Sequence, residues 1–273
     1  MNDRDCVAFL QWSLPRLGMR WPGFRRVRGQ VCKRIGRRLR GLALDGIDAY
    51  RAHLDAHPGE WAVLDGLTRV TVSRFYRDRQ VYERLGHEIL PERAHAAAAA
   101  GRDAITVCSL GCGSGEEPFS VALLWSVRVQ RRFPGIAMRI RALDADPHLL
   151  ERARTACYPA GTLRELPPDL RAAGFREAGD RCCLRAPWAR SVAFERHDIR
   201  DGVPPGPWDV VLCRNLAFTY FGEALQARIA RAAHEALRPG GWLVTGMRER
   251  LPAGSGLERG ARGSACHRRP VTP

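Results

Sequence analysis

The sequence predicts an α/β fold in which a small helical region precedes a parallel sheet covered by helices on both faces. From Ile105 onward, short apolar runs of strand length alternate with amphipathic segments of helical spacing. Strand–helix alternation of this kind produces a parallel sheet. Before Ile105, apolar residues recur only at helical spacing. The 273 residues suffice for one large α/β domain and one small helical domain.

The first expected domain, residues 1–90, is all-α. Its apolar residues at helical spacing are Phe9, Leu10, Trp12 and Leu17, then Leu44, Ile47, Tyr50 and Leu54, then Leu64 and Leu67, and finally Val81, Leu85 and Ile89. Residues 91–104 contain a polyalanine run and are expected to be a helix end and a linker. The run could equally extend the preceding helix.

A strongly basic helix is expected within this domain. Residues 20–40 contain nine basic residues and no acidic one. From Val27 to Leu39, apolar residues repeat every four positions, while basic residues fill the other faces. This pattern predicts an amphipathic helix with a basic outer surface.

The elements of the second domain follow in order along the chain. We expect strands at 105–110, 138–143, 191–194, 208–213 and 242–245, and helices at 117–129, 147–157 and 223–237. Residues 253–273 form a Gly/Arg-rich tail without a convincing strand. Either a weak edge strand lies near 261–267 or the last strand of the sheet is missing and the tail is disordered.

The charge balance is strongly basic. There are 44 Lys and Arg against 29 Asp and Glu, which gives a net charge of +15, and Lys33 is the only lysine. This balance favours an anionic partner such as nucleic acid, a membrane surface or an acidic protein. A GC-rich genome that spreads arginine over a solvated surface is the alternative explanation.

Composition also bounds the cellular location and the role of cysteine. No apolar run reaches membrane-spanning length, and charged residues occupy positions 3–5, so we expect a cytoplasmic protein without membrane insertion. The nine cysteines include no C-x-x-C pair, which argues against a metal site. The adjacent Cys182 and Cys183 suit no normal disulfide, so we expect most cysteines to be small buried apolar residues.

A glycine loop follows the first expected strand and precedes a helix. Gly111, Gly113 and Gly115 allow the backbone to turn sharply and to approach a ligand closely. Asp144 ends the second strand, where a carboxylate can bind ribose hydroxyls. Both features also fit a dinucleotide site. The alternative role of Asp144 is a turn or cap residue, although Asp146 before Pro147 is the better cap candidate.

Two further segments distinguish between these ligands. Glu116 and Glu117 begin the helix, where they favour its dipole but disfavour a pyrophosphate. S-adenosylmethionine carries a sulfonium and an amino group and no phosphate, so it suits these carboxylates. Arg214 and Asn215 follow the fourth strand, at the sheet edge where ligands gather in such folds.

With these motifs the chain resembles the CheR-type chemotaxis receptor methyltransferases, which methylate glutamate side chains of chemoreceptors. The resemblance covers most of residues 5–250 and is carried by residues 73–77 (SRFYR), 113–120 (GSGEEPFS), 143–146, 149–158, 209–215 and 240–241. It implies a Rossmann-like class I methyltransferase domain at 105–252, with S-adenosyl-L-methionine as cofactor and S-adenosyl-L-homocysteine as product.

The resemblance also implies roles for single residues. The implied cofactor contacts are Ser73, Arg77, Gly111, Gly113, Glu116, Glu117, Asp144, Asp146, Asp198, Ile199, Arg214 and Asn215. Among these, Glu117 or Glu116 would bind the amino group, Asp144 or Asp146 the ribose. Asp198 and Ile199 would flank the adenine, where the charge of Asp198 departs from the usual asparagine. Arg214 and Asn215 would line the methionine end.

Arg77 and Tyr220 are the implied catalytic residues. Arg77 would orient the incoming carboxylate, because guanidinium pairs bidentately with carboxylate; without the resemblance, a surface charge would be the preferred interpretation. Tyr220 would lie near the methyl group, although its spacing from Asn215 is one residue longer than usual. A short antiparallel insertion is implied at 175–188, where relatives bind a receptor tail peptide.

The resemblance therefore implies a monomeric protein-glutamate O-methyltransferase. Its partner would be the acidic helical region of chemoreceptors, docked by the basic helix around Arg25–Arg40. The alternatives are a nucleic-acid methyltransferase that uses the basic surface, a non-catalytic CheR-like regulatory protein, and a small-molecule methyltransferase. No nucleic acid is expected, because no aromatic platform is interleaved with the arginines.

Overall fold

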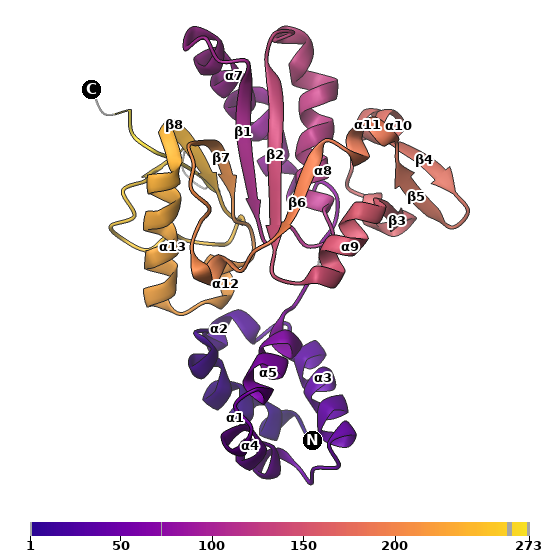
Figure 1. Ribbon diagram of the computed structural model, residues 1–273, viewed down its shortest axis with the longest axis vertical. Helices are drawn as coiled ribbons and strands as arrows, with labels where there is room; N and C mark the ends of the chain where they lie inside the picture. Colours follow the sequence, from indigo (N-terminus) through magenta and orange to yellow (C-terminus); the bar gives the residue numbers. More distant parts are fainter. Residues whose placement is uncertain (1, 72, 261–263, 272–273) are drawn as a thin grey trace. The chain divides into compact units, whose positions relative to one another are not determined.

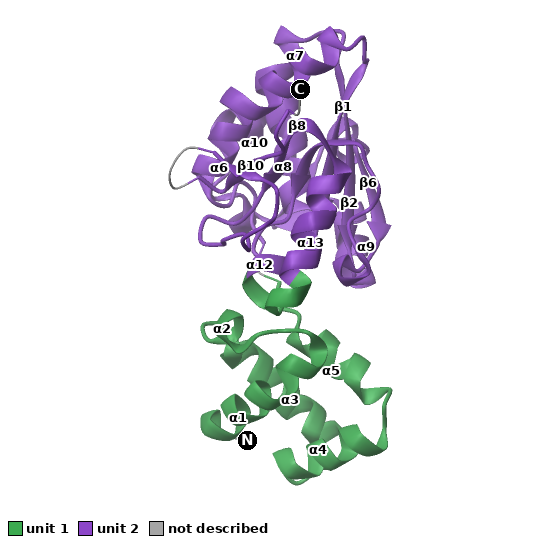
Figure 2. Ribbon diagram, turned by 90° about the vertical axis from the view of Figure 1, so that its left-hand side faces the viewer, with its two compact units in different colours: residues 1–72, 219–225 green, residues 73–218, 226–273 purple. Residues whose placement is uncertain are grey.

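The computed structural model describes residues 2–71, 73–260 and 264–271 (Figure 1). The chain divides into two compact units (Figure 2). Unit 1 comprises Met1–Val72 and Thr219–Leu225, and unit 2 comprises Ser73–Phe218 and Gln226–Pro273. The boundary thus falls earlier than the expected residue 90, and a short segment from the second half of the chain joins the helical unit.

Unit 1 is a helical bundle, as the periodicity predicts. Its elements are α1 (Asp3–Ser13), η1 (Leu14–Leu17), α2 (Trp21–Phe24), α3 (Arg28–Gly41), α4 (Ile47–Ala56) and α5 (Glu60–Thr68). The expected basic helix is confirmed as α3, which buries Val31, Ile35 and Leu39. The four-residue repeat places these side chains on one face, and that face packs into the bundle.

The expected linker at 91–104 is instead largely helical. Unit 2 opens with α6 (Arg79–Arg84), η2 (Leu85–Ile89) and α7 (Leu90–Ala99). Alanine has the highest helix propensity, so the polyalanine run continues the helix. Because Leu90, Ala94 and Ala97 are buried and α7 packs on strand β1, these residues belong to the α/β unit.

The main sheet of unit 2 has the order β6-β2-β1-β7-β8-β10-β9. Its strands are β1 (Ala104–Leu110), β2 (Ala137–Asp144), β6 (Val192–Arg196), β7 (Trp208–Leu212), β8 (Leu237–Val244), β9 (Glu258–Arg259) and β10 (Cys266–Arg268). The strands from β6 to β8 are parallel, which confirms the predicted α/β class. The carboxyl ends of these strands therefore meet at one edge of the sheet.

Helices cover both faces of this sheet (Figure 1). Besides α7, the helical elements here are α8 (Glu116–Leu124), η3 (Trp125–Val129), η4 (Gln130–Arg132), α9 (Pro147–Thr155) and α13 (Glu223–Ala236). The short η6 (Ile199–Asp201) follows β6, and the short α12 (Ala217–Tyr220) follows β7. Among the described residues, no helix combines the length and the apolar character that crossing a bilayer requires.

The C-terminal segment contributes strands β9 and β10, which confirms the first of the two alternatives, a weak edge strand near 261–267. β10 pairs antiparallel with β8 and with β9, so the last strand of the sheet is present. Ala265, Cys266 and His267 are buried there. Three apolar or neutral residues between arginines and glycines are too few to show a strand period. The sequence alone therefore left both alternatives open. Residues 261–263 and 272–273 of that tail lie outside the described residues.

A second, three-stranded sheet of order β3-β5-β4 fills the place of the implied insertion. It consists of β3 (Cys157–Pro159), β4 (Phe175–Ala178) and β5 (Arg181–Leu184), flanked by η5 (Ala160–Leu163), α10 (Pro168–Gly174) and α11 (Ala186–Ala189). β3 joins from outside the 175–188 range. The implied insertion is therefore larger than the sequence indicated.

Two disulfides correct the expectation for the cysteines. Cys157 and Cys183 face each other across the antiparallel strands β3 and β5 and are bonded. Cys6 and Cys32 are also bonded, which joins α1 to α3. Adjacency in sequence prevents Cys182 from pairing with Cys183, but it leaves Cys183 able to pair across the sheet. The five free cysteines are buried, as expected: Cys108, Cys112, Cys182, Cys213 and Cys266.

Candidate active site

The glycine loop lies between β1 and α8, at the carboxyl edge of the sheet. All three of its glycines have positive φ angles, of 71° at Gly111, 58° at Gly113 and 91° at Gly115. A Cβ atom at Gly111 would lie 2.3 Å from Cδ2 of Leu216, so a side chain there would have to displace Leu216 and adopt a strained backbone conformation. The loop needs glycine both for its conformation and for this close approach.

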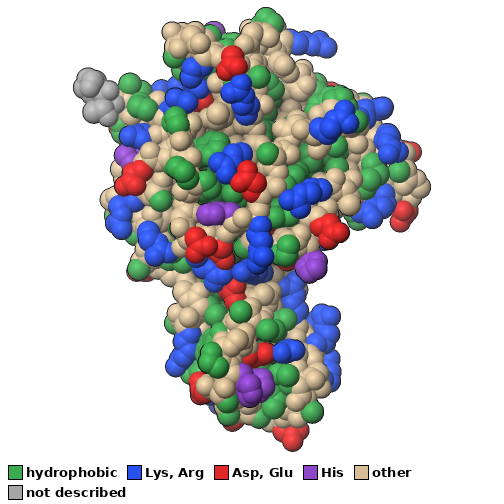
Figure 3. Space-filling model, in the orientation of Figure 1, with side chains coloured by type: hydrophobic (Ala, Val, Ile, Leu, Met, Phe, Trp, Pro, Cys, Tyr) green, Lys and Arg blue, Asp and Glu red, His purple; other side chains and the backbone are tan. Residues whose placement is uncertain are grey.

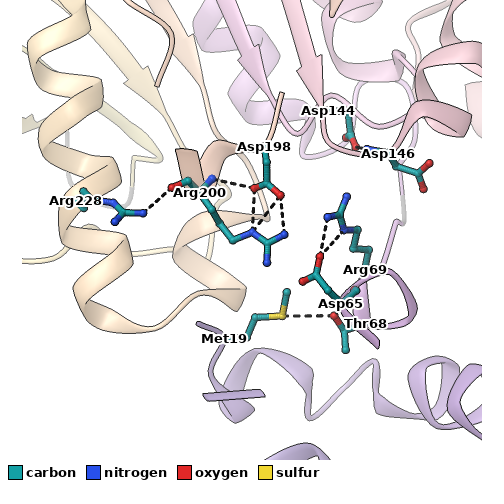
Figure 4. Close-up of polar contacts among 9 residues, drawn as sticks. All are labelled: Met19, Asp65, Thr68, Arg69, Asp144, Asp146, Asp198, Arg200 and Arg228. Carbon is teal, nitrogen blue, oxygen red and sulfur yellow. Dashed lines mark hydrogen bonds and ion pairs between the residues drawn. The ribbon is translucent and has the colours of Figure 1, made fainter. Parts of the chain in front are cut away.

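Asp144 holds the glycine loop in place. Its Oδ2 accepts the backbone N–H of Gly113 at 2.9 Å, and its Oδ1 accepts the backbone N–H of Asp146 at 2.9 Å (Figure 4). Asp146 accepts the backbone N–H of His148 and caps α9, as the sequence predicts for it. The two aspartates therefore differ in role: Asp144 faces the loop, whereas Asp146 stabilises a helix.

Of the two glutamates at the start of α8, Glu116 is buried and Glu117 is partly buried, and they differ in their partners. Glu117 accepts the Ser109 hydroxyl at 2.8 Å and an Arg214 guanidinium N–H at 3.2 Å, so both of its oxygens are engaged. Glu116 is only 3 % exposed, and its Oε2 finds no hydrogen-bond partner among the described residues. Burial raises the pKa of both carboxyl groups above the ordinary value.

Arg214 lies at the centre of the site. Its guanidinium binds Glu117 and the Tyr82 hydroxyl through Nη1, and it binds the carbonyl of Arg77 and Oδ2 of Asp78 through Nη2, at 2.7 to 3.2 Å. Burial alone would lower the pKa of Arg214, but these anionic and polar neighbours reverse the effect and raise it. The guanidinium is therefore fixed as a cation that joins β7 to the segment around Arg77.

The segment that carries Ser73 and Arg77 has an unusual backbone. Tyr76 and Asp78 both have left-handed conformations, with φ of 59° and 62°, on either side of Arg77. A non-glycine residue in this region costs on the order of 1 kcal/mol, and such outliers concentrate at functional sites. Ser73 is hydrogen-bonded to the Glu116 carboxylate and lowers its pKa, which partly offsets burial.

Asp198 and Ile199 follow β6 at the same edge. Asp198 binds the guanidinium and the backbone N–H of Arg200, with an ion-pair distance of 2.6 Å (Figure 4). Asp198 carries a negative charge that the usual asparagine lacks. Arg200 neutralises this charge within the chain. Ile199 is 5 % exposed.

Asn215 depends on a residue that the sequence did not single out. Glu249, which follows β8, accepts the backbone N–H of Asn215 at 2.8 Å and that of Gly246 at 2.6 Å. No local pattern marks Glu249, because it lies 34 residues from Asn215 and meets it only through the pairing of β7 with β8. Parallel neighbouring strands could have indicated that their carboxyl-end loops meet.

Tyr220 is the one predicted site residue outside unit 2. It belongs to unit 1, where its ring packs against Phe24 with 5.0 Å between ring centroids. All the other predicted residues lie in unit 2. Those from Gly111 to Asn215 lie at or near the carboxyl edge of its sheet, and Ser73 and Arg77 join them through Glu116 and Arg214.

Comparison with known proteins identifies the family of this chain. Residues 71–263 match the family described as "CheR methyltransferase, SAM binding domain". The chain is 31% identical over 193 residues to the chemotaxis protein methyltransferase of Listeria monocytogenes, with 70% of each chain covered. It is 30% identical over 242 residues to that of Escherichia coli K12, with 85% of this chain and 79% of the relative covered.

Solved structures of methyltransferases also match. One of them, the glycopeptide N-methyltransferase MtfA complexed with sinefungin, is 16% identical with a TM-score of 0.33, covering 65% of this chain and 57% of that chain. The family match, together with the mostly parallel sheet, gives the class I methyltransferase fold and its cofactor. The chain belongs to the CheR methyltransferase family and is an S-adenosylmethionine-dependent methyltransferase of chemotaxis.

Proposed function

We propose that this methyltransferase acts in the cytoplasm on glutamate carboxylates of chemoreceptors and forms methyl esters. One observation supports the cofactor's place: the buried carboxylate of Glu116, with an oxygen that lacks a partner among the described residues, adjoins a loop whose three glycines all have left-handed φ angles. A buried unpaired carboxylate is costly, so a cationic ligand group beside it would stabilise the site.

The remaining cofactor contacts follow from the geometry of the sheet edge. We assign the amino group of S-adenosylmethionine to Glu116 rather than Glu117, because both oxygens of Glu117 are already engaged. Asp144 is the candidate for the ribose hydroxyls, since Asp146 caps α9. Asp198 and Ile199 are the candidates for the adenine.

The reaction needs positioning more than acid–base chemistry. When bound, S-adenosylmethionine supplies an electrophilic methyl group, and an ionised glutamate carboxylate is already a competent nucleophile at pH 7. Catalysis then depends on near-attack geometry and exclusion of water. Arg77 is the proposed orienter of the incoming carboxylate, since its backbone is held by Arg214 between two left-handed residues. Tyr220, which belongs to unit 1, is the second catalytic residue that the family resemblance implies.

The acidic helical region of the receptor is the proposed partner of α3. Lys33, Arg37 and Arg40 are exposed and recur at i, i+4 and i+7, so they form one stripe opposite the buried face. Among the described residues, none of the three has an acidic partner, whereas Arg34 and Arg38 of the same helix bind other groups of unit 1. The stripe therefore presents uncompensated positive charge to an acidic helix.

Transfer of labelled methyl groups tests the proposal. The protein is incubated with methyl-labelled S-adenosylmethionine and either receptor cytoplasmic fragments or RNA. We expect base-labile label on the receptor. Label in RNA would instead favour a nucleic-acid methyltransferase, and cofactor binding without any transfer would favour a non-catalytic relative.

Arg77→Ala is the matched variant for this assay. We expect it to reduce transfer by at least about 100-fold, because a misplaced nucleophile loses near-attack geometry. Circular dichroism and the melting temperature should remain those of the parent protein. Arg79→Ala is the control, since Arg79 is exposed two residues away. Equal activity of Arg77→Ala and the parent would remove the role given to Arg77.

A further inference from the structure

Glu249 connects the loops that follow two neighbouring strands at the catalytic edge. It follows β8 and is 8 % exposed. A single oxygen, Oε2, accepts both the backbone N–H of Asn215 and that of Gly246. The carboxylate therefore fixes the backbone of Asn215 relative to β8.

The conformation of Asn215 explains why such an anchor is needed. Its φ of 56° lies in the left-handed region, which a non-glycine residue adopts at a cost. Its side chain also packs tightly against the next loop: a Cβ atom at Gly246 would lie 2.4 Å from the amide nitrogen of Asn215. Glu249 and Gly246 thus determine together where the Asn215 amide lies.

We propose that Glu249 is a positioning residue for cofactor binding and methyl transfer, acting through Asn215. This inference rests on the proposed place of Asn215 at the methionine end of the cofactor. Glu249 needs no contact with the cofactor for this role. Its own contribution is the acceptor oxygen that holds the Asn215 backbone in its left-handed conformation.

The geometry predicts a specific pattern among substitutions. Because one oxygen accepts both hydrogen bonds, the side-chain carbonyl of a glutamine can replace it, whereas leucine of similar volume cannot. We expect Glu249→Leu to weaken binding of S-adenosylhomocysteine at least about tenfold and to lower kcat/KM about 100-fold. Glu249→Gln should lose less than Glu249→Leu in both measurements, because its carbonyl can still accept the two backbone N–H groups. Isothermal titration calorimetry and initial rates provide the two readouts.

Asp209→Asn is the matched control. Asp209 is also a buried carboxylate that accepts a backbone N–H, from Thr106, but it lies at the amino end of β7. Its replacement should lower the melting temperature and leave affinity for S-adenosylhomocysteine unchanged. If Asp209→Asn weakened this affinity as much as Glu249→Leu, general loosening of the strand would explain the loss and the proposal would be wrong.

A second variant covers the case in which Glu249→Leu fails to fold. In Gly246→Ala the added methyl group would lie 2.4 Å from the Asn215 amide nitrogen and 2.9 Å from Oε2 of Glu249, so it disturbs the same anchor and we expect the same loss of affinity. Unchanged affinity in whichever of the two variants folds would overturn the proposal. Because the calorimetric readout uses no acceptor protein, failure of the parent to methylate receptors would refute the proposed substrate and leave the role of Glu249 standing.

Discussion

Burying the Glu116 carboxylate costs free energy, and the same carboxylate is the proposed contact of the cofactor's amino group. The helix start at α8 favours an acidic residue, but burial of the carboxyl group raises its pKa and penalises the charged form. Neighbouring Glu117 meets the same penalty and offsets it with Arg214 and Ser109. For Glu116, its own backbone N–H, the Ser73 hydroxyl and the charge of Arg152 favour the charged form, but burial outweighs them and the pKa stays raised. A cationic group that binds beside this carboxylate would compensate its charge.

This difference predicts a pH dependence of cofactor binding. Because its pKa is raised in the free protein, the Glu116 carboxyl group takes up a proton at a higher pH than an ordinary glutamate. A cationic ligand must displace this proton in order to bind. Affinity for S-adenosylhomocysteine should therefore fall as pH drops from neutral through that raised pKa. Calorimetry in buffers of different ionisation heat should show proton release on binding.

Glu116→Gln is the corresponding variant. This variant should bind S-adenosylhomocysteine at least about tenfold more weakly than the parent protein at neutral pH. Its affinity should no longer depend on pH, because glutamine does not titrate. Glu151→Gln, an exposed glutamate on α9, is the control and should change neither property. A pH dependence that persisted in Glu116→Gln would assign the titration to another group.

At the scale of elements, α3 divides its arginines between contacts inside unit 1 and the exposed stripe proposed to bind a partner. Arg38 forms a bidentate pair with Glu60 of α5 at 2.6 and 2.9 Å, and Tyr50 of α4 donates to the same carboxylate. Arg34 binds the carbonyls that end α5. These contacts leave the stripe of Lys33, Arg37 and Arg40 for a partner.

The Glu60 pair predicts an acid-dependent stability of unit 1. The hydrogen bond from Arg38 is the main reason that the pKa of Glu60 is lowered. Its stabilisation is therefore complete above the unfolded-state pKa of a glutamate and is lost as pH falls through the lower folded-state value. Glu60→Ala should lower the free energy of unfolding by about 1–2 kcal/mol at neutral pH, since Arg38 is one-third exposed.

Urea unfolding at neutral pH and at about pH 3 measures this effect. The difference between Glu60→Ala and the parent should shrink in acid. Asp48→Ala, which removes an exposed ion pair with Arg51, is the control and should change stability by less than about 0.5 kcal/mol. An equal effect of both variants would show that the buried network adds nothing beyond surface charge.

Elements with a strong period were predictable from sequence, and those defined by distant pairing were not. The strands around Val107 and Val210 and the helix α3 show clear apolar patterns, and the structure has them in place. β10 is three residues long and exists only because β8 offers it a paired edge. Glu249 and the Cys157–Cys183 disulfide could not be predicted for the same reason, since both are contacts between segments that are distant in sequence and leave no local pattern.

For the whole molecule, the net charge of +15 has two components. Figure 3 shows basic side chains scattered over the visible face of unit 2 with acidic ones among them, and many form ion pairs such as Arg128–Asp169 and Arg141–Glu195. The same view shows basic side chains gathered along the edge of unit 1 where Figure 1 places α3. Only the second component has the arrangement of a binding surface.

Salt should therefore affect recognition of the receptor but hardly affect binding of the cofactor. We expect KM for a receptor fragment to rise steeply between about 50 and 300 mM NaCl, because exposed charges are screened over about a Debye length. Affinity for S-adenosylhomocysteine, which binds at buried groups, should stay nearly constant. The triple variant Lys33→Glu, Arg37→Glu and Arg40→Glu should raise KM at low salt and flatten the salt dependence.

The control carries the same change of charge on exposed positions of unit 2, at Arg131, Arg132 and Arg190. It should retain the parental KM and salt dependence. If both triple variants raised KM equally, overall charge rather than the α3 stripe would attract the receptor.

The single lysine of the chain provides an unusually direct probe of this surface. Because Lys33 is exposed on the stripe and no other lysine exists, an amine-reactive dye can modify only this side chain and the terminal amine. A fluorophore attached there would report receptor docking by its change in emission or anisotropy. Most proteins require engineered cysteines for such labelling, whereas the arginine-rich composition of this chain supplies a unique attachment point.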